Sequence, residues 1–147
     1  MNPQNRLHME FPNLPSNVGL ARVTIASFAS QMDFTLGELE EIRVAVSEAV
    51  SNAVIHAYPE GEGIITVNAA IEGGYLTVEV IDQGKGIEDV ELAKTPAFST
   101  APERMGLGLV FMESFMDHLS VESQVGKGTR IFMRKRPERE QDGSNVV

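Results

Sequence analysis

One predicted helix, from Thr35 to about Ala57, constrains the fold more than any other part of this sequence. It begins with a capping-box pattern, in which Thr35 is followed three positions later by Glu38, and it ends before Tyr58-Pro59. A helix with almost no polar face must be largely buried, and its few polar side chains need partners. The second half of this helix is of that kind, with the apolar residues Val44, Ala45, Val46, Ala49, Val50, Ala53, Val54 and Ile55.

Three polar residues interrupt the apolar surface of this helix at steps of four, namely Glu48, Asn52 and His56. Steps of four place them on one face, each about 6 Å further along the axis. A carboxamide oxygen is a hard, neutral ligand suited to Mg²⁺, and a carboxylate one turn away could accept a proton from a water or a hydroxyl group. The alternative is a solvated polar stripe, and for His56 alone a hydrogen-bonded packing histidine is the better interpretation.

A second candidate site is Asp82-Gln83-Gly84-Lys85-Gly86, which follows a predicted strand. An aspartate at the end of a strand can accept a hydrogen bond from an exocyclic amine such as that of adenine. Two glycines separated by one residue let the backbone turn sharply and pass close to a ligand. On its own, however, this motif is better interpreted as an ordinary turn.

A third candidate site is Gly106-Leu107-Gly108, which is predicted to open a helix running from Leu107 to Asp117. Glycines at a helix start expose backbone N–H groups to a phosphate, and the positive end of the helix dipole favours the anion. Taken alone this pattern is common and therefore weak. The preceding residues, 95–105, show no periodicity and contain two prolines, which favours a mobile loop.

The remaining pattern predicts an α+β fold, a two-layer α/β sandwich with a mixed, mostly antiparallel sheet and helices on one face. Gly73-Gly74 permits positive φ at both turn positions, which favours a hairpin. The sequence has no GxxxxGK[ST] phosphate loop and no GxGxxG after a strand, so a doubly wound nucleotide-binding fold is not indicated.

The predicted elements are strand 7–11, helix 18–32, strands 64–71 and 75–81, a short helix 88–94, and strands 119–123 and 129–134 around a turn at 125–128.

Length and composition favour a single domain from a reducing compartment. The chain has 147 residues, of which 1–135 are predicted to form one domain and 136–147 a polar, disordered tail. The absence of cysteine excludes disulfides, thiolate zinc sites and thiol nucleophiles, and it favours the cytoplasm. The net charge of −9 argues against direct binding to nucleic acid or to an anionic membrane. Neither a signal peptide nor an apolar run near the ~20 residues that cross a bilayer is expected.

Taken together, in this order and spacing, the motifs resemble the ATP-binding boxes of the Bergerat (GHKL) ATPases. Glu48-xxx-Asn52-xxx-His56 looks like the N box, and Asp82-x-Gly84-x-Gly86 looks like the G1 box. Gly106-x-Gly108-Leu109 looks like the G2 box, with Phe98–Met105 as the ATP lid. Gly128-Thr129 resembles the strand-borne Gly-Thr that closes the adenine pocket. The resemblance implies an ATP-binding domain.

Three longer stretches, ARVTIASFASQMD, VSEAVSNAVIHAY and MGLGLVFMESFMDHLSVES, resemble the sporulation anti-sigma F factors, and the resemblance runs from about Arg6 to Arg134. Members of that family are serine/threonine protein kinases that also capture a sigma factor. The resemblance implies a homodimer that uses ATP or ADP with Mg²⁺, binds a sigma factor, and phosphorylates a small anti-anti-sigma protein. The nucleotide state would then decide the partner.

Two alternatives stay open. One is a nucleotide-dependent sigma-binding module of the stress-response type with little kinase activity, which the slightly short segment between Phe98 and Gly106 would also fit. The other is the detached ATPase module of a histidine kinase.

The resemblance also implies roles for individual residues of the N and G1 boxes. Glu48 would be the general base that activates a serine hydroxyl of the partner, and Asn52 would hold Mg²⁺. Asp82 would read adenine. The residues lining the pocket beside it would be Gly84, Gly86 and Thr129.

Further roles concern the phosphates and the protein partners. Arg104 would place positive charge on the γ-phosphate and would also meet a partner. Arg22 would meet both the sigma factor and its antagonist, although a simple surface arginine is the alternative. The other phosphate contacts would come from Ser99, Thr100 and the backbone of Gly106, Leu107 and Gly108.

Overall fold

The computed structural model describes residues 4–59, 61–87 and 103–138, and for residues 103–105 it describes the backbone alone. Along the described chain the elements are, in order, β1 (Asn5–Pro12), α1 (Ser16–Ala29), α2 (Leu36–Asn52), the π-helical turn η1 (Ala53–Ala57), β2 (Ile64–Glu72), β3 (Tyr75–Asp82), α4 (Glu103–Phe115), β4 (His118–Gln124) and β5 (Gly128–Lys135).

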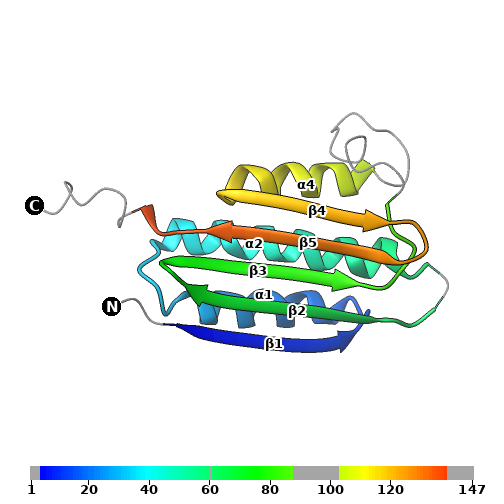
Figure 1. Ribbon diagram of the computed structural model, residues 1–147, viewed down its shortest axis with the longest axis horizontal. Coiled ribbons are helices and arrows are strands. Elements are labelled where there is room, and N and C mark those ends of the chain that lie inside the picture. The colour runs from blue at the N-terminus through cyan, green and yellow to red at the C-terminus, as the bar shows by residue number, and fades with distance from the viewer. Residues whose placement is uncertain (1–3, 60, 88–102, 139–147) are drawn as a thin grey trace, which may run out of the picture.

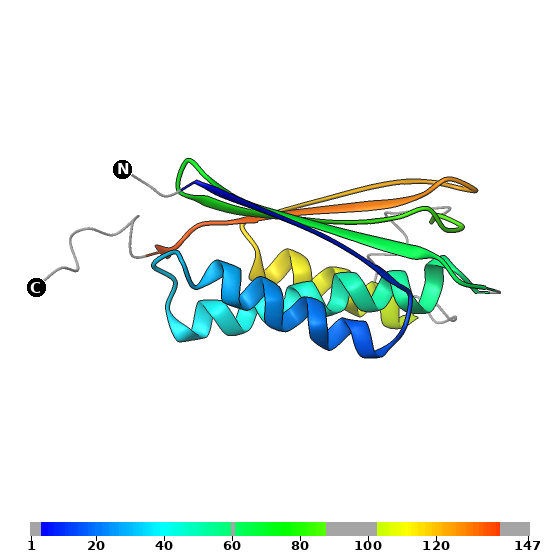
Figure 2. The same cartoon turned by 90° about the horizontal axis from the view of Figure 1, so that it is seen from below.

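The strands form one sheet, and the helices cover one of its faces (Figures 1 and 2). The strand order is β1-β2-β3-β5-β4, and each neighbouring pair is antiparallel. The predicted two-layer α+β fold is therefore confirmed, and the described strands are antiparallel throughout rather than mixed. Because β3 and β5 are neighbours, Asp82 at the end of β3 lies opposite Thr129 at the start of β5.

Helix α2 lies between α1 and α4 and is the most buried of the three. Its predicted capping box is present: Glu38 N–H donates to Thr35 Oγ1 at 3.1 Å, and Thr35 N–H donates to Glu38 Oε1 at 2.8 Å. Each valine or isoleucine side chain that α2 buries contributes about 1.5–3 kcal/mol to stability, and each alanine methyl contributes about 0.8 kcal/mol. The fully buried ones are Ile42, Ala45, Val46, Ala49 and Val50.

The two predicted hairpins are also confirmed, and glycines make their turns. Gly73 and Gly74 both have positive φ, 60° and 82°, in the turn between β2 and β3. Gly126 and Gly128, with φ of 82° and 116°, turn the chain from β4 into β5. Both hairpins thus use backbone conformations that other residues adopt only at a cost.

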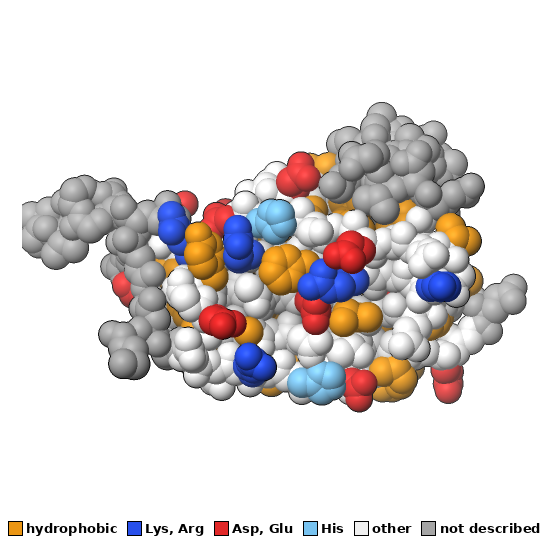
Figure 3. All heavy atoms as spheres, viewed as in Figure 1, with side chains coloured by type: hydrophobic (Ala, Val, Ile, Leu, Met, Phe, Trp, Pro, Cys, Tyr) orange, Lys and Arg blue, Asp and Glu red, His pale blue; other side chains and the backbone are white. Residues whose placement is uncertain are grey.

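The face of the sheet opposite the helices, here called the outer face, carries charged side chains of both signs (Figure 3). A row of hydrogen-bonded side chains crosses all five strands on it. The members of the row are His8, Asn68, Glu79, Arg130 and Glu122. Polar side chains alternate along each strand with the core residues on the helix side, as expected for a sheet with one covered face.

The end of the described chain is bound back to the domain. The N–H of Arg136 donates to Asp117 Oδ2 at 2.9 Å, and the N–H of Glu138 donates to Glu38 Oε2 at 3.0 Å. The rest of the predicted tail, 139–147, lies outside the described residues, as does the predicted short helix 88–94. Among the helices that the structure describes, none has the length and apolar character needed to cross a membrane.

Candidate functional site

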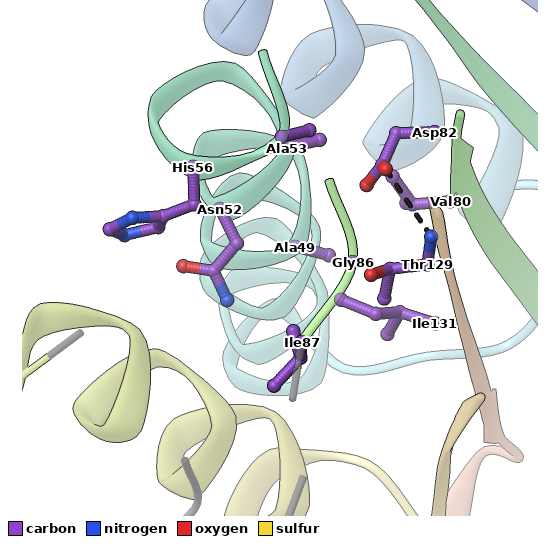
Figure 4. A pocket seen from close by; sticks show the side chains of 11 residues that line it. Ala49, Asn52, Ala53, His56, Val80, Asp82, Gly86, Ile87, Thr129 and Ile131 are labelled. Atoms are coloured by element: carbon purple, nitrogen blue, oxygen red, sulfur yellow. Dashed lines mark hydrogen bonds between the residues drawn. The ribbon is translucent and has the colours of Figure 1, made fainter. Parts of the chain in front are cut away.

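A small pocket opens between the helix layer and the sheet, and five residues predicted for the site, Asn52, His56, Asp82, Gly86 and Thr129, meet in it (Figure 4). Asn52 and His56 lie on the helix side, whereas Asp82 and Thr129 lie on the sheet side. The lining residues of this Asp82 pocket are Ala49, Asn52, Ala53, His56, Ala57, Val80, Asp82, Gly86, Ile87, Thr129 and Ile131. Its volume of about 20 Å³ holds one water molecule, so an aromatic base could enter only if the lining moved apart.

The sheet side of the pocket presents a buried carboxylate. Asp82 is only 8% exposed, and its Oδ1 accepts the N–H of Gly84 at 2.9 Å and the N–H of Thr129 at 3.3 Å. Burial raises the pKa of Asp82 above its ordinary value, and these two N–H groups lower it in part. Both bonds end on Oδ1, and no residue within the described ranges donates to Oδ2, which can therefore accept a hydrogen bond from a ligand.

The helix side of the pocket presents a carboxamide with unmet hydrogen-bonding capacity. Asn52, the last residue of α2, is 8% exposed, and its Nδ2 has no hydrogen-bond partner in the described part of the structure. A buried polar group left without a partner costs about 1–3 kcal/mol. A polar ligand in the Asp82 pocket would remove that cost. Rotation of the carboxamide by 180° would present Oδ1 in place of Nδ2.

The last turn of the predicted helix is π-helical. The helix was expected to continue to Ala57, but its α-helical part ends at Asn52 and η1 covers Ala53–Ala57. The wider turn changes the direction of His56 relative to simple i+4 spacing, yet His56 still lines the pocket. Single π turns inside α-helices occur frequently at functional sites.

Two glycines after Asp82 permit close backbone contacts. A Cβ at Gly84 would collide with the carbonyl of Ala57 on η1, and the N–H of Lys85 donates to the same carbonyl oxygen at 2.8 Å. Gly86 has φ of +79°, and a Cβ there would collide with the backbone of Gln124. These contacts fix the loop that follows Asp82 against η1 on one side and against the β4–β5 turn on the other.

Tyr58 strengthens this connection, although it was not predicted as a site residue. Its hydroxyl accepts the N–H of Gln83 at 2.8 Å and donates to the carbonyl of Ile64 at 2.9 Å. The end of the helix, the start of β2 and the loop after Asp82 therefore meet at one hydroxyl group. These hydrogen bonds could not be predicted from the sequence, because a tyrosine that follows a helix is equally compatible with ordinary packing.

Glu48 is half-buried on α2, one turn before Asn52, and it faces α4. A Cβ at Gly108 would lie 2.8 Å from Glu48 Oε2 and 3.5 Å from Asn52 Oδ1. The missing side chain of Gly108 thus provides the space that the Glu48 carboxylate occupies, whereas Asn52 Oδ1 would be at ordinary contact distance. This is a packing role, which differs from the phosphate-binding role expected of the glycine.

The prediction that Gly106, Leu107 and Gly108 open a helix is wrong in this conformation. Helix α4 begins at Glu103, so the last residues assigned to the lid loop, 103–105, are helical. A proline just before a helix removes no internal hydrogen bond, and an acidic residue is favourable in the first turn, so Pro102-Glu103 suits a helix start. Beyond the first turn, N–H groups bond to carbonyls four residues back and are not free to bind phosphate.

The other predicted site residues lie apart from the pocket or outside the description. Arg22 is exposed on α1, and its Nη1 lies 3.4 Å from Ser47 Oγ, to which it donates. Arg104 belongs to α4, but its side chain is outside the described part of the structure, as are Ser99 and Thr100 altogether.

Two apolar lining residues were missed although the strand period could have revealed them. Alternate side chains of a strand face the same way. Val80 lies two residues before Asp82 on β3, and Ile131 lies two residues after Thr129 on β5, so each shares the pocket side with its polar neighbour.

Comparison with known proteins identifies the family. Residues 11–135 match the histidine kinase-like ATPase domain. The anti-sigma F factor of Clostridium acetobutylicum is 48% identical over 135 residues, which span 90% of this chain and 94% of that protein. The anti-sigma F factor of Geobacillus stearothermophilus is 45% identical over 135 residues, which span 90% of this chain and 92% of that protein.

Solved structures share the fold at lower identity. A structure of the RsbU and RsbW domains of a Mycobacterium tuberculosis protein superposes with a TM-score of 0.64 at 22% identity, over 91% of this chain. That match spans 32% of the M. tuberculosis chain, and it supports the fold alone. From the family match and the curated relatives together, the chain belongs to the anti-sigma F factors, within the histidine kinase-like ATPase domains.

Proposed function

We propose that this protein is an anti-sigma factor and a serine/threonine protein kinase, which inhibits a sporulation sigma factor and uses Mg-ATP to phosphorylate a serine of its anti-anti-sigma antagonist. The observation that carries the proposal is the pairing of buried Asp82 with buried, partly unsatisfied Asn52 across one pocket. The names of the relatives, anti-sigma F factors, support the sigma-binding part.

Asp82 and its apolar neighbours on the sheet side of the pocket are the groups proposed to recognise adenine. Oδ2 of Asp82 would accept a hydrogen bond from the exocyclic amine of adenine, and a charged acceptor makes such a bond stronger than a neutral one. Val80 and Ile131 supply apolar walls against the base. The backbone of Gly86 also forms part of the pocket wall, where its positive φ and the close contact with Gln124 require a glycine.

Asn52 fits a role at the metal and the phosphates. With its carboxamide rotated, Oδ1 would offer Mg²⁺ the kind of hard oxygen ligand that it prefers. The ion, when bound, would neutralise charge on the phosphates. The unsatisfied Nδ2 of Asn52 and the buried carboxylate of Asp82 on the same pocket support a nucleotide with its cation as the ligand.

Glu48 would act as the general base. Its carboxylate would take the proton from the partner's serine hydroxyl as the serine oxygen bonds to the γ-phosphorus and the bond from that phosphorus to the β–γ bridging oxygen breaks, leaving ADP. One helical turn separates Glu48 from Asn52, so the base and the metal ligand would lie on the same side of the transferred group.

The phosphate contacts proposed for Ser99, Thr100, Arg104 and the backbone at Gly106–Gly108 complete this site. Because α4 begins at Glu103, these backbone N–H groups could bind phosphate only if the first turns of α4 unwound. Nucleotide binding would therefore be accompanied by a change at the start of α4.

Arg22 is the proposed contact with both protein partners. It is exposed on α1 beside two exposed apolar side chains, Leu20 at 52% and Val23 at 64%. An arginine among exposed apolar residues is typical of the energetic centre of protein interfaces.

The outer face is the proposed surface for a second copy of the chain. Aromatic and arginine side chains gather on it: Arg134 and Arg136 lie over Tyr75, and Arg130 lies over Phe132. Charges of both signs make the face complementary to itself about a two-fold axis. Sedimentation equilibrium should show a dimer that Phe132→Arg converts to a monomer, and an unchanged dimer would reject this surface.

The experiment that tests the proposed activity is phosphotransfer. The protein is mixed with Mg²⁺, γ-labelled ATP and a candidate anti-anti-sigma protein, and the labelled product is treated with acid. Acid-stable label on the partner that is lost in Glu48→Gln but kept in Glu40→Gln, an exposed carboxylate on the same helix, supports the serine kinase. Sigma binding without transfer would support the sigma-binding module instead, and acid-labile label would support a histidine-kinase module.

A further inference from the structure

Two hydroxyl groups on neighbouring strands form a pair beside the Asp82 pocket. Ser123 on β4 lies opposite Thr129 on β5, and their hydroxyl oxygens are 2.8 Å apart, a normal O–H···O distance. Thr129 lines the Asp82 pocket, whereas Ser123 is not among its lining residues. Ser123 would therefore act on a ligand in this pocket through Thr129 or through Ile87, which its hydroxyl contacts.

The direction of the hydrogen bonds starts from a fixed donor. The backbone N–H of Ile87, which can only donate, gives its proton to Ser123 Oγ at 2.6 Å. Among the described residues, the single hydroxyl proton of Ser123 then has two acceptors within reach, Thr129 Oγ1 at 2.8 Å and the carbonyl of Gly128 at 3.2 Å. The shorter contact favours donation to Thr129.

The choice between these acceptors decides what Thr129 offers a ligand. If Ser123 donates to Thr129, the proton of Thr129 is released toward the pocket, and Thr129 is a donor. If Ser123 donates to Gly128, Thr129 must donate back to Ser123, and its hydroxyl can only accept from a ligand. A chain of bonds running from Ile87 through Ser123 to Thr129 also gains from the polarisation of each bond by the one before.

We propose that Ser123 is a positioning residue that makes Thr129 a hydrogen-bond donor at the base-reading edge of the pocket; this rests on the proposed adenine site. The backbone N–H of Thr129 holds Asp82 Oδ1, so the acceptor Asp82 and the donor Thr129 lie side by side. Adenine presents the matching pair, an amine donor at C6 and an acceptor at N1. A 6-oxopurine presents the reverse pair and is rejected, because it leaves buried polar groups unpaired.

The test compares ADP with 1-deaza-ADP, in which C–H replaces the N1 acceptor, by isothermal titration with Mg²⁺. The wild type should bind ADP about threefold to tenfold more tightly than 1-deaza-ADP, the range for one neutral hydrogen bond made directly or through a water. Ser123→Ala should reduce that ratio toward the value of Thr129→Val, which has no hydroxyl group. Ser123→Thr, which keeps the hydroxyl, should retain the wild-type ratio.

The ratio separates a positioning role from a structural one. Loss of a merely structural contact would weaken both nucleotides equally, so an unchanged ratio in Ser123→Ala would overturn the inference while leaving the nucleotide site intact. Ser123→Cys, which keeps the shape but donates weakly, supplies the same comparison if Ser123→Ala does not fold. Wild-type protein that bound neither nucleotide would overturn the proposed nucleotide site and this inference with it.

Discussion

The carboxylate of Glu48 on α2 occupies the space that a side chain on Gly108 of α4 would need. A Cβ at position 108 would lie 2.8 Å from Glu48 Oε2, closer than such contacts are found. The two helices therefore approach each other at the residue proposed as the general base. Gly108 lies within α4, so in this conformation its contribution is space for Glu48 rather than a free N–H group.

Gly108→Ala should abolish phosphotransfer by displacing Glu48. The loss should be at least about hundredfold, since general-base catalysis contributes about 10²–10⁴. Alanine favours an α-helix over glycine by about 1 kcal/mol and would also oppose the proposed unwinding of α4. ADP affinity of the same variant separates the two effects, because displacement of Glu48 leaves it unchanged and opposition to unwinding lowers it. The assay is transfer of label to the anti-anti-sigma protein, with Phe111→Ala, an exposed residue of α4 outside the proposed phosphate contacts, as the matched control. Wild-type transfer by Gly108→Ala would reject this role of the glycine.

Asp82→Asn should stabilise the nucleotide-free protein at pH 7, because burial raises the pKa of Asp82 and thus disfavours its charged form in the folded state. The asparagine Oδ1 can keep the N–H bonds of Gly84 and Thr129. The unfolding midpoint should rise by about 1–4 °C. A group with a raised folded pKa stabilises the fold below its unfolded pKa and loses that effect as pH rises through the folded value, so the advantage of Asp82→Asn should shrink on acidification. A lower midpoint at pH 7 would contradict this account of Asp82.

Gly84→Ala should destabilise the protein by about 2 kcal/mol or more, because its Cβ would collide with the carbonyl of Ala57 and separate η1 from the loop. Gly61→Ala is the matched control, since no atom lies within 4 Å of a Cβ there. Urea denaturation of the two variants measures the difference. Equal stabilities would mean that the loop and η1 do not depend on this contact.

Much of the fold could be predicted because its signals are local. The capping box of Thr35 and Glu38 and the positive φ of Gly73 and Gly74 act within a few residues, and the structure has both. The alternation of apolar and polar residues predicts the strands, and a helix as apolar as α2 has to be buried between other elements.

The features that sequence did not reveal depend on contacts between distant segments. The π turn at Ala53–Ala57 and the early start of α4 are backbone choices that an apolar pattern does not encode. The bonds of Tyr58 and Ser123 exist because strand pairing brings separate segments together. The motifs therefore predict where the pocket lies, whereas the side chains that hold its lining in place, such as Tyr58 and Ser123, can be identified only from the structure.

Glu38→Gln should destabilise the protein at neutral pH by about 0.5–1.5 kcal/mol, the net value of one hydrogen bond, because glutamine can keep the capping box but has one acceptor oxygen for the N–H groups of Thr35 and Glu138. Although burial works to raise the pKa of Glu38, hydrogen bonds from the N–H groups of Thr35 and Glu138 and from the side chain of Thr35, together with the charge of Lys135, hold it below the ordinary value. Such a group stabilises the fold above its unfolded pKa, and the effect is lost as pH falls through the folded pKa. The gap between wild type and variant in thermal unfolding should therefore narrow below about pH 4.5. A stability difference between wild type and Glu38→Gln that did not change with pH would show that the charge of Glu38 does not contribute to stability.

The most direct test of the central claim, that an adenine nucleotide binds in the Asp82 pocket, is the affinity for ADP measured by isothermal titration with Mg²⁺. In Asp82→Asn an amide NH₂ would face the amine of adenine, so the affinity should fall between about tenfold and hundredfold, as expected for a lost hydrogen bond to a charged group. Glu122→Gln, a carboxylate on the outer face of the same sheet, should bind ADP as the wild type does. ADP affinity of Asp82→Asn equal to that of the wild type would contradict the account and place the nucleotide elsewhere.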